Sequence, residues 1–240
     1  TPYFVYDTFQ NGLQFNSLEN LYEQDVYEEY EFIPYYDQDI GTAGAYNEQR
    51  KRIQGFGSPF NMGKLGQIGA GAYASTLHSI DIAKKKYEKT FFNYDSKNPK
   101  KISKNKPFSD NHKIFDRKLS DLKEGKNFYI SLNSGAFPDY KNYHDPAFTT
   151  ILTAESHLQT MGFNTHQIEL NGDFGLTVGA KVKIKTIKPT TIEDADFAPV
   201  MIDKYMSGEY LVTRIEHRFD DNFKMVVTIQ RDSSEESIDA

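Results

Sequence analysis

Hydrophobic and polar residues alternate in most of the readable stretches of this chain, which is the pattern of β-strands with one covered face. The first alternating stretch covers residues 3–8, and Asn11-Gly12 supplies a turn before a second one, so a hairpin is predicted. Ser17 then stands in the position of an N-cap, and the apolar spacing over residues 18–22 predicts a short helix.

The middle of the chain is less regular. Residues 41–71 combine many glycines with scattered apolar anchors, and we expect irregular structure there with a short helix or strand. Residues 71–82 alternate like a strand, and so do residues 128–132. Between them, residues 97–118 hold two prolines and many lysines, which predicts a long exposed loop.

The C-terminal part carries the clearest pattern. Pro146 marks the start of a helix whose apolar period, with Phe148, Ile151, Leu152 and Leu158, runs to Met161. Short strands at the spacing of a small β-barrel follow around residues 168–170, 176–178, 182–184, 211–217 and 225–229. The connection over residues 188–206 is long and acidic, and it is expected to be a surface loop.

These elements predict a mainly β fold with a few helices, in the α+β class. A length of 240 residues is enough for two small domains. We expect an N-terminal domain over residues 1–142, with a Lys-rich excursion near residues 84–126. Residues 143–240 are expected to form a second domain, a helix followed by a small β-barrel.

Composition and charge argue against several classes of site and function. The absence of Cys excludes disulfides and sulfur-ligated zinc, and no apolar stretch is long enough to span a bilayer as a helix. A net charge of -6 argues against general affinity for nucleic acid, although residues 19–39 are acidic and residues 84–126 are basic. The 18 Phe and 16 Tyr residues favour β-structure and protein contact surfaces.

No set of residues has the spacing of a catalytic or metal site. The nearest candidates are pairs of acids and histidines, namely Glu155 with His157, His112 with Asp116, and Asp194 with Asp196. Because none has a recognised ligand spacing, surface or packing roles are favoured, and neither a cofactor nor a metal is expected. Glu155 is the best candidate for the general acid of a peptidoglycan-cutting enzyme, but its spacing suggests the flank of a packing face.

Two further motifs have plain structural interpretations. Gly66, Gly69 and Gly71 lack the spacing of a phosphate-binding loop, so tight turns before a strand are favoured. Lys84-Lys85-Lys86 and Lys100-Lys101 could contact nucleic acid, but the acidic total favours a solvated or protein-facing surface.

Several segments recur in one known order and spacing: Phe4–Thr8, Gly12–Leu18, Gly71–Ser75 with Asp81, Gln167–Asp173, Leu176–Val182, Ser207–Phe219 and Lys224–Arg231. This pattern resembles the central baseplate hub proteins of T-even-like contractile-tailed phages, which are related to the hub part of type VI secretion spikes. The C-terminal segments are similar to the second tube barrel of that family.

The resemblance implies two tube-forming β-barrels per subunit and a ring of three subunits. It implies contacts with the tail tube protein, with a spike or tail-lysozyme protein and with other baseplate proteins, while DNA only passes through the channel. It also implies a non-enzymatic virion protein, assembled in the host cytoplasm, whose first barrel is incomplete in this chain because complete hub proteins carry more preceding sequence. The alternatives are a tail-tip peptidoglycan-degrading enzyme and a host-surface binding module.

Overall fold

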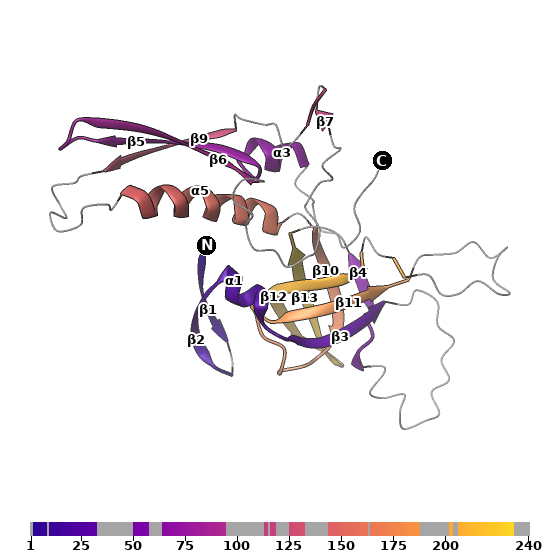
Figure 1. Ribbon diagram of the computed structural model, residues 1–240. Helices are drawn as coiled ribbons and strands as arrows, with labels where there is room; N and C mark the ends of the chain where they lie inside the picture. The colour runs from indigo at the N-terminus through magenta and orange to yellow at the C-terminus, as the bar shows by residue number, and fades with distance from the viewer. Residues whose placement is uncertain are drawn as a thin grey trace.

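The computed structural model describes residues 2–8, 10–32, 50–57, 64–94, 113–114, 116–118, 125–132, 144–162, 164–187, 202–203 and 206–232. These residues form a β-rich α+β fold, as predicted, with a curled six-stranded sheet and a separate three-stranded sheet (Figure 1). None of the helices in the described part of the chain combines the length and the apolar character that crossing a membrane would require.

The N-terminal hairpin and helix lie where the sequence predicts them. Strands β1 (Tyr3–Thr8) and β2 (Gly12–Ser17) are antiparallel, and Gly12 begins β2 with a φ of 62° that glycine adopts without strain. The Ser17 hydroxyl accepts a hydrogen bond from the backbone N–H of Asn20 at 3.2 Å, which caps helix α1 (Leu18–Glu23). The helix buries its apolar side in a small cluster made of Leu18, Leu21, Tyr22 and Leu211, with Phe4, Tyr6 and Met161 beside it.

The curled sheet has the strand order β3-β11-β12-β13-β10-β4. Its strands are β3 (Val26–Phe32), β4 (Gly55–Gly57), β10 (Asn164–Asn171), β11 (Lys181–Thr186), β12 (Gly208–Phe219) and β13 (Phe223–Arg231). Neighbouring strands are antiparallel except β3 and β11, which run parallel. Two strands from the first quarter of the chain therefore complete a sheet whose other four strands come from its C-terminal part.

The two edges of this sheet meet at a single bridge. The backbone N–H of Glu31 donates to the carbonyl of Lys51 at 3.0 Å, and the N–H of Ile53 donates back to Glu31 at 2.9 Å. One residue further on, the N–H of Gln54 donates to the carbonyl of Glu169 in β10 at 2.8 Å. The segment leading into β4 thus joins β3 to β10, and the sheet curls into a half-barrel.

The inside of the half-barrel is a packed apolar core. On β13, Met225, Val227 and Ile229 alternate with half-buried neighbours and have no exposed surface. The full cluster consists of Tyr30, Ile53, Ile168, Leu170, Leu176, Val182, Ile184, Tyr210, Val212, Met225, Val227 and Ile229. Since these side chains fill the interior, the sheet does not enclose a channel of its own.

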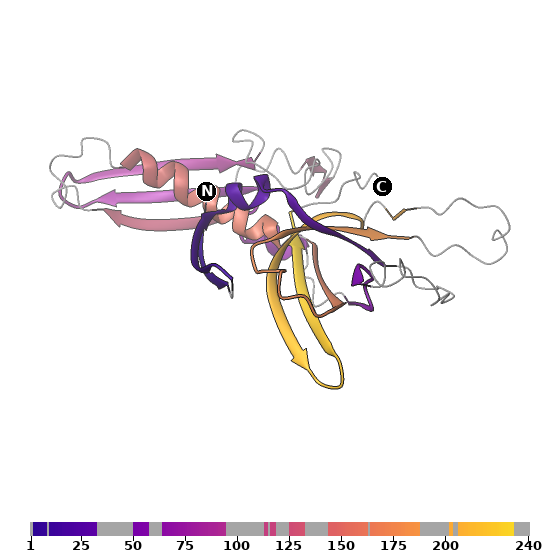
Figure 2. The ribbon, with the colours of Figure 1, turned by 90° about the horizontal axis from the view of Figure 1, so that it is seen from below.

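The second sheet has the order β6-β5-β9, built from β5 (Ala74–Asp81), β6 (Lys86–Asn93) and β9 (Lys126–Leu132). Helix α5 (His144–Met161) lies along one face of this sheet, as both ribbon views show (Figure 1; Figure 2). Leu77, Phe92 and Leu152 form the core between them. The remaining elements are α3 (Lys64–Gly69) and the short strands β7 (Lys113–Ile114) and β8 (Arg117–Lys118).

The structure corrects three expectations. Residues 176–178 do not form a strand: Leu176 and Thr177 are irregular, with the Leu176 side chain in the core, and Val178 turns the chain at Gly179, whose φ is 86°. Helix α5 begins at His144, two residues before the expected Pro146. Leu158, expected on the packing face, is 40% exposed, because the face of α5 around Ser156 and His157 turns inward instead.

The two expected tube-forming barrels are not seen in the described residues, which contain one curled half-barrel sheet. Those that fall within residues 1–142 supply a hairpin, two strands of the curled sheet, the open three-stranded sheet and the small β7–β8 pair. The curled sheet therefore draws strands from both sides of the expected boundary at residues 142/143, and that boundary lies outside the described residues. Alternation marks strands locally but does not say which distant strands pair, so it did not predict that β3 and β4 join the C-terminal strands.

The alternation on β13 gives a first testable prediction. Val227→Asp or Ile229→Asp would place an uncompensated charge inside the core and should lower the free energy of unfolding by roughly 3 kcal/mol or more. Thr228→Asp, on the half-buried face between them, should have a much smaller effect. Urea unfolding of the three variants measures this, and equal losses at all three positions would contradict the assigned faces.

A buried histidine on α5 gives the second prediction. His157 is 3% exposed, neither ring nitrogen has a hydrogen-bond partner among the described residues, and burial lowers its pKa from 6.5 to about 4. The unfolded chain gains a proton there at a higher pH than the folded chain, so stability is full above pH 6.5 and is lost as the pH falls toward 4.

His157→Met removes this proton uptake and leaves no unsatisfied ring nitrogen. We expect the variant to be at least as stable as the parent chain near neutral pH and to lose about 3 kcal/mol less stability on acidification to pH 4. Part of the pH dependence should remain, because burial also lowers the pKa of His166 to about 4. Urea unfolding across this pH range tests the prediction, and an unchanged pH dependence in the variant would contradict it.

Candidate functional site

The structure does not bring the candidate acids and histidines together. Glu155 accepts hydrogen bonds from Lys126 Nζ at 3.2 Å and from Gln159 Nε2 at 3.0 Å, whereas His157 is buried on another side of the same helix. Asp116 is exposed in the turn between β7 and β8, and His112, Asp194 and Asp196 lie outside the described residues. Within the described ranges, no three His, Asp or Glu side chains are grouped so that they could hold a metal ion.

The glycine and lysine motifs have structural roles. Gly71, with a φ of 100°, forms the expected tight turn after helix α3, and its N–H donates to the carbonyl of Ile68 at 3.1 Å. Gly66 and Gly69 lie within the helix itself, so the tight-turn prediction is wrong for these two. Lys84 and Lys85 form the turn of the β5–β6 hairpin, where the Asp81 carboxylate accepts the N–H of Lys84 at 3.0 Å. Lys100 and Lys101 lie outside the described residues.

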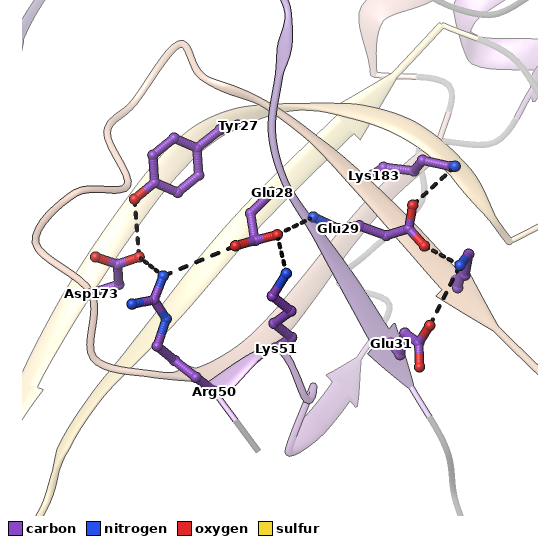
Figure 3. A network of polar contacts seen from close by, with 9 residues as sticks. Tyr27, Glu28, Glu29, Glu31, Arg50, Lys51, Asp173 and Lys183 are labelled. Carbon is purple, nitrogen blue, oxygen red and sulfur yellow. Dashed lines mark hydrogen bonds and ion pairs between the residues drawn. The ribbon is translucent and has the colours of Figure 1, made fainter. Parts of the chain in front are cut away.

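The acidic strand β3 is paired with cations of the same chain (Figure 3). Lys51 Nζ forms an ion pair with the Glu28 carboxylate at 2.8 Å. The Arg50 guanidinium lies 4.0 Å from Glu28 and 3.9 Å from Asp173. The hydrogen bond from Lys51 lowers the pKa of Glu28. Partial burial is the main cause that raises the pKa of Tyr27, and the hydrogen bond from its hydroxyl to Asp173 at 3.0 Å raises this pKa further.

The other half of this network joins β3 to β11. Glu29 pairs with Lys183 Nζ at 3.0 Å and with Lys185, and the hydrogen bond from Lys185 is the main cause that lowers the pKa of Glu29. Lys185 also reaches Glu31 at 3.5 Å. These described carboxylates of the acidic stretch are therefore engaged within the chain, and the network holds the edge of the curled sheet together rather than offering a catalytic pair.

Within the described residues, large apolar side chains gather on three exposed surfaces. The first, the hairpin surface, is the outer face of β1 and β2, and it consists of Tyr3, Val5, Leu13 and Phe15. Each of these residues is more than 60% exposed, and the rings of Tyr3 and Phe15 stack at 5.1 Å with an angle of 8°. A two-stranded hairpin is only marginally stable by itself, so a partner that covered its apolar outer face would stabilise it.

The second, the sheet surface, is the face of the three-stranded sheet that points away from α5. It consists of His78, Ile80, Tyr87, Phe91 and Tyr129, which the strand register places on one side. Tyr129 is 75% exposed and stacks on the His78 ring at 4.7 Å, and His78 Nδ1 lies 2.6 Å from the Tyr87 hydroxyl. The contacts hold these rings in a defined arrangement.

The third, the tip cluster, lies at the outer end of the β12–β13 hairpin and consists of Phe174, His217, Phe219 and Phe223. Phe223 stacks on Phe219 at 4.7 Å with an angle of 5° and on Phe174 at 4.6 Å. A Cβ at Gly172 would fall 2.0 Å from the Phe223 ring, so glycine is required there for the ring to pack. Phe219 remains 69% exposed and Phe174 remains 50% exposed.

Sequence reasoning anticipated contact surfaces from the aromatic content but did not identify these residues. The alternation of the hairpin did place Tyr3 and Val5 on one face, and it gave no sign of which face stays open. Nothing local in the sequence connects Phe174 with Phe219 or Phe223, because the fold alone brings them together.

Comparison with known proteins finds similarity among solved structures. No protein-family model matches the chain, and no curated protein matches it. Among solved structures, the chain is similar to the tail protein from Neisseria meningitidis MC58, with a TM-score of 0.42 and 8% sequence identity. The match covers 88% of this chain and 46% of that one, so this chain spans less than half the length of the tail protein it matches.

Proposed function

We propose that this chain is a structural, non-enzymatic component of the central hub in the baseplate of a contractile phage tail. There it forms a ring that connects the tail tube to the spike and lets the genome pass during injection. The observation that carries the proposal is that the described part of this small β-rich chain has three separate exposed apolar surfaces. A monomeric soluble protein rarely exposes several such surfaces, whereas an assembly covers them.

The packed half-barrel suits a channel wall. Its interior is filled, so a passage for DNA would run between the subunits of a ring and not through a single subunit. The bridge between Glu31 and Arg52 ties the two edges of the sheet, and tied edges resist strand slippage under load. These features support a load-bearing role.

The partners follow from the sequence resemblance. We propose a ring of three copies with the tail tube protein on one side and a spike or tail-lysozyme protein on the other, in contact with other baseplate proteins. Two tube-type domains per subunit would arise if neighbouring chains or preceding sequence complete the open three-stranded sheet, whose edge strands are β6 and β9. The protein would then reside in the tail baseplate of the virion.

Locating the chain in assembled virions tests this role. Electron cryo-microscopy of tails that contain the chain should place it around the central axis, between the tail tube and the spike. The tail tube protein in the same reconstruction serves as the internal reference for that axis. A position away from the axis would overturn the hub role, and a position at the fibre tips would favour a host-surface binding module.

The enzyme alternative makes an opposite prediction on cell-wall material. Glu155 is held by Lys126 and Gln159, so we expect no clearing zone in a peptidoglycan zymogram run beside lysozyme. A clearing zone that disappears in Glu155→Gln would overturn the structural proposal. Glu169→Gln is the matched control, because Glu169 is also paired with a lysine at 3.1 Å, on a different element.

A further inference from the structure

We infer that the tip cluster of one copy docks on the sheet surface of a second copy, so that the chain associates head to tail. The inference deepens the proposed ring by naming the two surfaces that meet, and it relies on the proposed function only for the number of copies. Three observations support it: the aromatic character of both surfaces, their opposite charges, and their separation within one chain.

The two surfaces have matching apolar chemistry. The tip cluster presents stacked phenyl rings with Phe219 outermost, at 69% exposed. The sheet surface presents Ile80, 48% exposed, opposite Tyr87 in the strand register, with Tyr129 on the neighbouring strand β9. Aromatic rings that pack edge-to-face or offset against each other stabilise a contact beyond the area they bury.

The charges beside the two surfaces are opposite. Asp220 and Asp221 form the exposed turn at the end of the β12–β13 hairpin, next to the tip cluster. The cation beside it, Arg218, lies on the opposite face of β12 and pairs there with Glu216. The sheet surface is bordered by Lys84 and Lys85 in the β5–β6 turn, and Lys89 lies on it with its ammonium 4.8 Å from the Phe91 ring. Complementary charges steer association and disfavour wrong pairings.

The register keeps the acids of the β5–β6 hairpin away from this contact. Asp81 and Glu88 lie on the face that α5 covers, and Glu88 pairs there with Lys86. The hairpin surface, by contrast, carries the exposed Asp7 on its outer face, whose charge has the same sign as the carboxylates of the tip. The charges therefore favour the sheet surface as the partner of the tip.

One copy cannot make this contact with itself. The β12–β13 hairpin extends away from the three-stranded sheet in both ribbon views, so its tip lies far from the sheet surface of its own chain (Figure 1; Figure 2). A contact between two different surfaces is heterologous, and it leaves one free copy of each surface at the ends of every open chain. Such a contact closes into a ring when the rotation per subunit allows it.

Two single variants that complement each other test the inference. Phe219→Ser removes the outermost ring of the tip, and Tyr129→Ser removes the most exposed ring of the sheet surface. Each variant alone should self-associate about tenfold more weakly than the parent chain or worse. Their equimolar mixture should form a one-to-one pair and nothing larger, because only one intact tip and one intact sheet surface are then available. Native mass spectrometry over a concentration series measures this.

Phe15→Ser is the matched control, since Phe15 is an equally exposed aromatic residue (66%) on the hairpin surface, and it should associate like the parent chain. Thermal unfolding verifies that all three variants are folded. The inference is overturned if the mixture forms no pair, if the Phe219→Ser chain alone still dimerises through its intact sheet surface, or if the parent chain stays monomeric throughout. None of these results decides the position of the chain in the tail, so the proposed function is tested separately, by electron cryo-microscopy of the tails.

Discussion

The parallel pairing of β3 with β11 is the contact on which the curled sheet depends. It brings a strand from the first quarter of the chain beside Lys183, 154 positions after its partner Glu29, and it positions the bridge to Arg52. The ion pairs at this seam are partly exposed, so each contributes about 1 kcal/mol at most. The larger stabilisation comes from burying Tyr30 and Ile53 against the C-terminal strands, while the charges select the register.

Local patterns predicted most elements, because a strand with one face in the core leaves a period-two signal, as on β13, and a helix leaves its cap, as at Ser17. Local patterns did not predict strand β3, and the reason is physical. Three glutamates within its seven residues resemble a solvated acidic segment, and only their lysine partners on β11 make that composition compatible with a sheet. The partners are distant in sequence, so local reasoning could not pair them.

The surfaces were less predictable than the core. Composition indicated protein contacts, but the exposure of a side chain depends on what the rest of the fold leaves uncovered. Tyr87 and Phe91 are ordinary alternating strand residues in the sequence. Their exposure follows only from the position of α5, which covers the opposite face of the sheet. By composition, residues 19–39 form an acidic block and residues 84–126 a basic block. In the structure, Glu28 and Glu29 form ion pairs with lysines of the same chain, whereas Asp220 lies exposed at a projecting tip. Composition alone cannot separate paired acids from exposed ones.

Strands β12 and β13 connect the core to the tip cluster. The first residues of β12, from Gly208 to Val212, are buried apart from Glu209, whereas its last residues are exposed. The change occurs where the register shifts at Thr213, and such a bulge bends and twists a strand out of its sheet. One continuous hairpin therefore has its base fixed in a packed core and its end free for contact. A load applied to Phe219 at the tip would pass along two hydrogen-bonded strands into the half-barrel, and no flexible linker intervenes.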